Sequence, residues 1–375
     1  MQAKIERAIL LRCLGHIQSV VERRNTIPIL SNVLIEAETG SDGDGIIRVM
    51  ATDLDMQIVE TVAAKVETPG AITVPAHLLF EIARKLPEGS EVALDAADGE
   101  MRVAAGRFGS RLKTLPRDDF PIIAPGDLPC QFEMAAKDIT SIIEKTRLAI
   151  STEETRYYLN GIFLHVTDDG GSLLRAAATD GHRLARYTLP CPAGASAMPD
   201  IILPRKCVGE LHKLLSEGGT SQVQIELSPS KVRFTYASAV LTSKLIDGTF
   251  PDYTRVIPTG NDKLLKVDPK ALGQGVDRVA TIASDKTRAV KMAVAAGGVT
   301  LSVTSPENGT ASEEVAGDYA AEPMEIGFNA RYLADIIGQI DGDAVEIHFA
   351  DAAAPTLIRE SGDNPALYVL MPMRV

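Results

Sequence analysis

The chain repeats one pattern about three times, and this repetition constrains its fold more than any single motif. The segments 74–86, 203–215 and 327–337 each show helical apolar spacing, and each is followed by a Gly-containing turn and a strand-like run. The copies lie about 125 residues apart, one third of the 375-residue chain. A threefold array of similar modules is more typical of a scaffold than of an enzyme with one active site.

Each third also begins with an amphipathic helix. We expect helices over roughly 4–20, 76–86, 137–149, 205–215, 269–283 and 331–339, with short strands between them. Asp268 followed by Pro269 is typical of a helix start, with Asp as the N-cap and Pro in the first turn. Helices gathered on one face of antiparallel sheets predict an α+β fold. Proline-rich stretches at 121–129 and 258–262 predict three domains, 1–128, 129–260 and 261–375.

Charge is divided unevenly along the chain. The six expected helices hold 14 Lys and Arg against seven Asp and Glu, a balance of +7. Because the whole chain carries −12, the remainder carries −19. A basic helical layer within an acidic shell is able to hold a polyanion on one surface and repel it elsewhere. Lys and Arg are also good helix formers, so this pattern alone fits an ordinary helical surface equally well.

Several classes of protein are disfavoured. Nowhere do 18 apolar residues run together, and the first 21 residues lack a signal-peptide core, so we expect no membrane span and no export. The four cysteines are scattered and form no C-x-x-C pair, which predicts reduced, mostly buried thiols in the cytoplasm. We expect the run 42–45 (Asp-Gly-Asp-Gly) to be a hairpin turn, because a calcium loop needs further ligands. No phosphate-loop or dinucleotide motif occurs, and we expect no cofactor.

The stretch 179–184 contains Asp180 and His182, which could belong to a hydrolase triad. Gly181 between them indicates a turn, and no G-x-S-x-G elbow supplies a serine, so a structural or binding role is favoured. The apolar C-terminus, 368–375, fits both an edge strand and a methionine-lined groove. A hydrolase, or a peptide-binding scaffold unrelated to DNA, remains the alternative to a DNA-bound scaffold.

Phrases along the whole chain resemble the bacterial DNA polymerase III beta subunit family, the replicative sliding clamps. These phrases are Thr26–Asn32, Ala51–Asp55, Leu115–Pro121, Arg156–Gly161, Ala178–Leu184, Leu241–Gly248, Phe250–Tyr253 and Met371–Arg374. They occur in the family's order and span essentially all of the sequence.

The resemblance implies three similar domains per chain and a head-to-tail homodimer that closes into a ring, with helices around the hole and sheets outside. Double-stranded DNA would be encircled without sequence readout, through phosphate contacts. The expected activity is processivity without catalysis. The expected partners are the DNA polymerase III alpha subunit, the clamp loader, and other polymerases and repair proteins that bind through short peptide motifs.

The resemblance also assigns residues. The expected DNA contacts are Arg24, Arg84, Lys85, Lys145, Arg147, Arg205 and Lys206. The expected peptide pocket consists of Leu159, Thr179, Gly181, His182, Arg183, Leu184, Pro251, Arg255, Val256, Asn329, Tyr332, Val369, Leu370, Met371, Pro372, Met373 and Arg374. Across the dimer interface, the expected apolar partners are Leu112 and Ile282.

Some positions depart from the family pattern. Thr287 replaces an aromatic pocket residue, and Ala353 and Pro355 also differ, which predicts an altered motif preference. Ser110 replaces an aromatic residue at the expected interface. Since the three repeats do not share the His182 loop or the Met371–Arg374 tail, we expect partner specificity to lie in these two segments.

Overall fold

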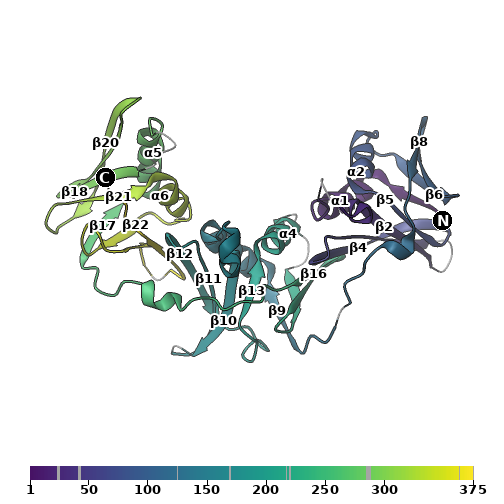
Figure 1. Ribbon diagram of the computed structural model, residues 1–375, viewed down its shortest axis with the longest axis horizontal. Coiled ribbons are helices and arrows are strands. Elements are labelled where there is room, and N and C mark those ends of the chain that lie inside the picture. The colour runs from purple at the N-terminus through teal and green to yellow at the C-terminus, as the bar shows by residue number, and fades with distance from the viewer. Residues whose placement is uncertain are drawn as a thin grey trace. The chain divides into compact units, whose positions relative to one another are not determined.

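The computed structural model describes residues 1–22, 26–40, 44–124, 126–168, 170–216, 218, 221–283, 289–362 and 364–374. One element order occurs three times: strand, helix, four strands, helix, three strands. Each third is itself a tandem of two strand–helix–three-strand units. The threefold repeat and its internal twofold repeat, both predicted from the sequence, are therefore confirmed (Figure 1).

The elements of the first copy are β1 (Gln2–Glu6), α1 (Arg7–Ile17), β2 (Asn32–Thr39), β3 (Asp44–Thr52), β4 (Met56–Thr68), β5 (Gly70–Pro75), α2 (Ala76–Lys85), β6 (Glu91–Ala97), β7 (Glu100–Ala105) and β8 (Phe108–Lys113). Those of the second are β9 (Cys130–Ala135), α3 (Ala136–Thr146), β10 (Gly161–Asp168), β11 (Ser172–Thr179), β12 (Arg183–Pro190), β13 (Ile201–Pro204), α4 (Arg205–Ser216), β14 (Gln222–Leu227), β15 (Lys231–Tyr236) and β16 (Ala239–Lys244). Those of the third are β17 (Lys263–Val267), α5 (Pro269–Ala280), β18 (Ala289–Ala295), β19 (Gly298–Ser305), β20 (Gly309–Tyr319), β21 (Met324–Asn329), α6 (Ala330–Ile337), β22 (Val345–Phe349), β23 (Thr356–Glu360) and β24 (Ala366–Leu370).

The first helix begins later than the sequence pattern indicates. Residues 2–6 form strand β1, with alternating exposed and buried side chains, and Ile5 is buried on that strand. Ile5 fits both the helical and the strand period. The predicted helix therefore began too early and included part of strand β1. With the observed bounds, the six α-helices hold twelve Lys and Arg against six Asp and Glu, a balance of +6. The predicted excess of positive charge on the helices is confirmed.

The chain forms two compact units, each built on one 12-stranded antiparallel sheet. Unit 1 contains 1–140, 192–199 and 206–245, and unit 2 contains 141–191, 200–205 and 246–375. In unit 1, β4 of the first copy pairs with β16 of the second. In unit 2, β12 of the second copy pairs with β24 of the third. Backbone hydrogen bonds therefore join successive copies into continuous sheets.

Helix pairs pack against these sheets through their apolar faces. In unit 1, α1 and α2 lie side by side, and in unit 2 so do α5 and α6 (Figure 1). Helix α5 buries Leu272, Val276 and Val279, which share one face because they are spaced by three or four residues. The predicted cap is present, since the Asp268 carboxylate accepts a hydrogen bond from the amide of Ala271 at 2.6 Å. Among the described residues, no helix is long and apolar enough to cross a membrane.

Candidate peptide pocket and cationic surface

The turn between β11 and β12 is fixed by its own side chains. The Thr179 hydroxyl donates to the carbonyl of Arg183 at 2.7 Å, and Asp180 Oδ1 accepts from the amides of His182 and Arg183 at 2.9 and 3.0 Å. Gly181 has φ +88°, a left-handed conformation that glycine adopts without steric cost. Residues 179–183 are therefore a preformed turn, as Gly181 indicated in the sequence.

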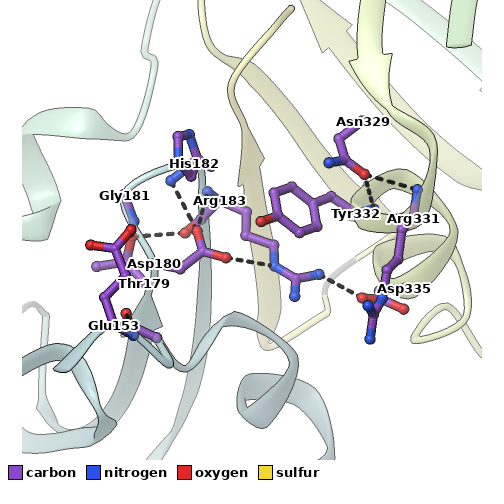
Figure 2. Close-up of polar contacts among 11 residues, drawn as sticks. Glu153, Thr179, Asp180, Gly181, His182, Arg183, Asn329, Arg331, Tyr332 and Asp335 are labelled. Carbon is purple, nitrogen blue, oxygen red and sulfur yellow. Dashed lines mark hydrogen bonds and ion pairs between the residues drawn. The ribbon is translucent and has the colours of Figure 1, made fainter. Parts of the chain in front are cut away.

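Arg183 connects this turn to helix α6. Its Nε donates to Asp180 Oδ2 at 3.1 Å, its Nη1 donates to Asp335 Oδ2 at 2.7 Å, and its guanidinium lies 4.1 Å from the centre of the Tyr332 ring (Figure 2). The Arg183 side chain is only 10% exposed, so these interactions are poorly screened by water. The sequence did not point to Asp335, because a carboxylate on a helix face usually faces solvent.

The contacts of Asp180 disfavour the hydrolase alternative. One carboxylate oxygen accepts two backbone amides and the other accepts Arg183, so Asp180 orients the turn and Arg183 instead of the His182 imidazole. The imidazole stacks near the Tyr332 ring, with centroids 6.4 Å apart. Within the described residues, no three His, Cys, Asp or Glu side chains are arranged to hold a metal ion.

A mainly apolar cavity of about 190 Å³ opens beside the turn. Four of its lining residues belong to one buried apolar cluster: Leu159, Leu184, Tyr253 and Val369. Its lining is Leu159, Thr179, Gly181, His182, Arg183, Leu184, Pro251, Asp252, Tyr253, Val256, Val369 and Met371. The fold thus brings together ten of the residues predicted for the pocket, from four separate stretches of chain. We call this cavity the apolar pocket.

Two lining residues were missed by sequence reasoning. Asp252 and Tyr253 lie at the start of a short 3-10 helix, Tyr253–Val256, directly after Pro251. The phrase Phe250–Tyr253, which resembles the family, contains both residues and is the signal that points to them. The Tyr253 hydroxyl and His165 Nε2 form a hydrogen bond of 2.8 Å. Burial lowers the pKa of His165. Neutral His165 therefore holds one wall of the apolar pocket.

The remaining predicted pocket residues lie outside this lining. Asn329 is the N-cap of α6, since its Oδ1 accepts from the amides of Arg331 and Tyr332 at 3.0 and 3.2 Å (Figure 2). Arg255 is 83% exposed and pairs with Asp252 at 2.9 Å. The others outside the lining are Tyr332, Leu370, Pro372, Met373 and Arg374.

The C-terminal segment is held by backbone hydrogen bonds on both sides. The amide of Met371 donates to the carbonyl of His182 at 2.9 Å, and the amide of Met373 donates to the carbonyl of Gly327 on β21 at 2.8 Å. Met371 and Met373 are 39% and 42% exposed, yet only Met371 lines the apolar pocket. The two thioethers have different neighbours because the backbone of Met371 pairs with the turn at His182, whereas that of Met373 pairs with β21.

Of the departures from the family pattern, Thr287 lies outside the described residues. Ala353 and Pro355 belong to the loop before β23. The amide of Ala353 donates to Asp351 at 2.7 Å, and the carbonyl of Pro355 accepts from Asn261 at 2.9 Å. Neither lines the apolar pocket.

The turn beside the apolar pocket has a counterpart in the first copy of the repeat, at 52–56. The Thr52 hydroxyl donates to the carbonyl of Met56 at 2.9 Å, and Asp53 Oδ1 accepts from the amides of Asp55 and Met56 at 3.0 and 2.7 Å. Leu54 takes the place of Gly181, with φ +79°. The expectation that the repeats do not share the His182 loop is therefore wrong for its backbone, because a Thr-Asp pair builds the same turn twice.

The two turns differ in the cation that binds the second Asp oxygen. At 179–183 it is Arg183 of the turn itself, whereas at 52–56 it is Lys206, which lies 153 residues away on α4. Lys206 also donates to the carbonyl of Val20 at 3.1 Å and lies 3.5 Å from Glu22. Lys206, predicted as a DNA contact, is therefore tied to residues of the first copy within unit 1.

The other predicted DNA contacts fall into two groups. Lys145 is only 14% exposed and donates to the carbonyl of Gln339 at 2.5 Å and to Asp341 at 2.6 Å. The exposed group comprises Arg84, Lys85, Arg147 and Arg205, of which Arg84 and Lys85 flank Glu81 at 2.7 and 3.8 Å. Arg24 lies outside the described residues.

The predicted dimer residues also differ in exposure. Leu112 on β8 is 4% exposed, and its strand partner is Met101 of β7. Phe108, four residues earlier on the same strand, is 42% exposed. Ile282 is half-buried, and its carbonyl accepts from Asn308 at 3.1 Å.

Family models identify the class of protein. The N-terminal, central and C-terminal domains of the DNA polymerase III beta subunit match residues 1–124, 133–252 and 254–374 in that order. The chain therefore belongs to the DNA polymerase III beta subunit family, with three clamp domains of α+β structure. It is a DNA sliding clamp subunit that serves DNA polymerase III in processive replication.

Individual relatives match over their full length. The beta sliding clamp of Caulobacter vibrioides is 51% identical over 378 residues, and that of Escherichia coli is 34% identical over 378 residues, each with 100% of both chains covered. The crystal structure of a sliding clamp from Bartonella birtlesii bound to griselimycin has a TM-score of 0.96 at 49% identity, with 100% of both chains covered. A C. crescentus clamp crystallised with PEG has a TM-score of 0.95 at 50% identity and covers 100% of this chain and 99% of its own.

Proposed function

We propose that the chain forms a closed head-to-tail homodimer that encircles duplex DNA and tethers polymerases without chemistry of its own. The three clamp domains are 1–128, 129–260 and 261–375, since the repeated element order restarts at β9 and at β17. Its partners are the polymerase III alpha subunit, the clamp loader and repair proteins in the cytoplasm. The observation that carries the proposal is the apolar pocket, in which a preformed turn, an arginine–tyrosine contact and a methionine converge.

Short peptides would bind in the apolar pocket. Apolar walls with a few fixed polar groups are typical of peptide and small-molecule sites. The relative from Bartonella birtlesii is bound to griselimycin, and we propose that griselimycin occupies the same pocket in this chain. The polar groups at the rim, including the Asp252 carboxylate and the Arg183 guanidinium, would orient the ligand.

Two methionines test the assignment of the apolar pocket. Met371→Ser should weaken griselimycin binding about tenfold, because roughly 1–2 kcal/mol of apolar contact is lost. Met373→Ser is the matched control, since its side chain is equally exposed but outside the pocket lining. Binding is measured by calorimetry on the full chain. Equal effects of the two substitutions, or none, would contradict the assignment. Deletion of 371–375 should abolish binding while the dimer persists.

The edges of the two sheets offer a route to the dimer. Strand β8 is the terminal strand of its sheet, and residues 309–316 of β20 pair only with β19 among the described strands. Exposed Arg111 on β8 and exposed Glu314 on β20 have opposite charges. We propose that these edges pair between two copies, next to Phe108. Unpaired edges are strong templates for such pairing.

A charge exchange tests this interface. Arg111→Glu and Glu314→Arg should each lower the dimer fraction in light scattering, and the double variant should restore it. No loss in the single variants would refute the pairing. Encirclement itself is tested on nicked circular DNA, where the loaded clamp should be retained until the circle is linearised. Equal loss from both forms would refute topological binding.

A further inference from the structure

A second cavity, of about 550 Å³, lies beside the apolar pocket in unit 2. It is bordered by the end of α3, by the short 3-10 helix Arg147–Ala149 and by one face of α6. Three arginines contribute to its walls: Arg147, Arg183 and Arg331. We call this cavity the arginine groove. Arg183 borders both cavities.

The three arginines of this groove differ in their partners. Arg183 is neutralised by Asp180 and Asp335. Arg147 and Arg331 are exposed, and neither forms a hydrogen bond or ion pair through its side chain with any residue that the structure describes. Two unpaired guanidinium groups from facing elements therefore border one polar, open cavity. The lining also contains the carboxylates of Glu144 and Asp335, and Asp335 is already paired with Arg183.

We propose that the arginine groove binds a phosphate group of the DNA backbone, held by Arg147 and Arg331. A guanidinium presents a planar fork of donors that matches phosphate oxygens. The groove is open and polar, which suits a solvated phosphodiester better than an apolar peptide. Arg147 is among the DNA contacts that the resemblance implies, whereas Arg331 is not. The inference rests on the proposed encirclement of DNA. Free phosphate has the same binding chemistry as a phosphodiester, so the experiment must distinguish these two ligands.

Salt dependence of DNA binding tests the assignment. The affinity of the full chain for a fluorescent 30-base-pair duplex is measured by anisotropy at several salt concentrations. Each lost phosphate contact should reduce the slope of log affinity against log salt by about 0.9. Arg147→Gln and Arg331→Gln should each lower the affinity, and the double variant, which loses the one phosphate contact, should show the full change of about 0.9. The control is Arg102→Gln, an exposed arginine on β7, which should leave the slope unchanged.

Competition identifies the source of the phosphate. At constant ionic strength, inorganic phosphate should displace the duplex from the wild-type protein more readily than from the double variant. An unchanged slope in the double variant overturns the proposal. Phosphate binding that depends on both arginines, with an unchanged slope, would assign the groove to free phosphate instead. Retention of the wild-type clamp on nicked circles separates these results from failure of encirclement, and thermal melting verifies that the variants fold.

Discussion

The carboxylate of Glu346 offers the sharpest quantitative test of the fold that carries the apolar pocket. On β22 it lies opposite Lys266 of β17 and Arg359 of β23. One oxygen accepts from Lys266 at 2.9 Å and from Ser361 at 3.1 Å, and the other accepts from Arg359 at 3.0 Å. Burial alone would raise the pKa of Glu346, but these hydrogen bonds outweigh it and hold the pKa at about 2.

The pKa difference converts into stability. Relative to the ordinary value of 4.5, a pKa of about 2 corresponds to about 3 kcal/mol at neutral pH, at 1.36 kcal/mol per unit. The Glu346 side chain is only 8% exposed, but Lys266 and Arg359 are 42% and 45% exposed, so solvent screening lowers the contribution to about 2 kcal/mol. A depressed pKa stabilises the fold above pH 4.5, and this contribution is lost as pH falls toward 2.

The measurement compares wild type with Glu346→Gln in urea at pH 7 and pH 3. Pulsed hydrogen exchange, read on peptides from β22 and β23, reports unfolding of this part of the sheet. The variant should be less stable by about 2 kcal/mol at pH 7, and the difference should shrink by more than half at pH 3. Glu325→Gln is the control, because its pair with Lys291 is exposed and should contribute less than about 1 kcal/mol. A constant gap between wild type and Glu346→Gln at both pH values would refute the reasoning.

Three further predictions concern single residues. Burial raises the pKa of Cys207 to about 12 and that of Cys13 well above its ordinary value, so neither thiol should react with iodoacetamide at pH 8 until the protein unfolds; mass spectrometry that finds rapid labelling of the native chain would contradict this. Gly181→Ala should lower griselimycin affinity by about tenfold, since φ +88° costs an alanine about 1–2 kcal/mol; unchanged calorimetric binding would show that the turn is not strained. Lys206→Met should lower the melting temperature of unit 1 by several degrees because Asp53 is left unpaired, and adding Asp53→Asn should recover part of the loss; a variant that melts like wild type while losing DNA would instead support a direct DNA contact.

The repeat and the helices were predicted from local sequence patterns, whereas the residues of the apolar pocket were implied by the resemblance to the family. Helical spacing in 203–215 and turn residues at 179–183 act within a few residues of each other. The resemblance of short sequence stretches to the family identified pocket residues that lie far apart along the chain, such as Val369. The first strand was missed because Ile5 satisfies two periods at once.

Ion pairs between distant segments could not be predicted in the same way. Lys206 and Asp53 are 153 residues apart, and Arg183 and Asp335 are 152 apart. Charge counting treats every lysine as available, whereas the fold commits Lys145 and Lys206 to particular acceptors. Burial of Leu112 is likewise a property of the sheet it belongs to. Composition predicts the total charge of a surface, but tertiary contacts decide which charges remain free.

Arg183 also has a consequence for compounds that bind in the apolar pocket. Its guanidinium borders the apolar pocket on one side and the arginine groove on the other, and its position is set by Asp180, Asp335 and Tyr332. A compound that displaces this side chain from one cavity changes the shape and charge of the other. Linkage makes such an effect reciprocal, so an anion in the groove alters the compound's affinity by the same factor. Affinities measured on the free protein will therefore differ from those on the DNA-loaded protein whenever a compound moves Arg183.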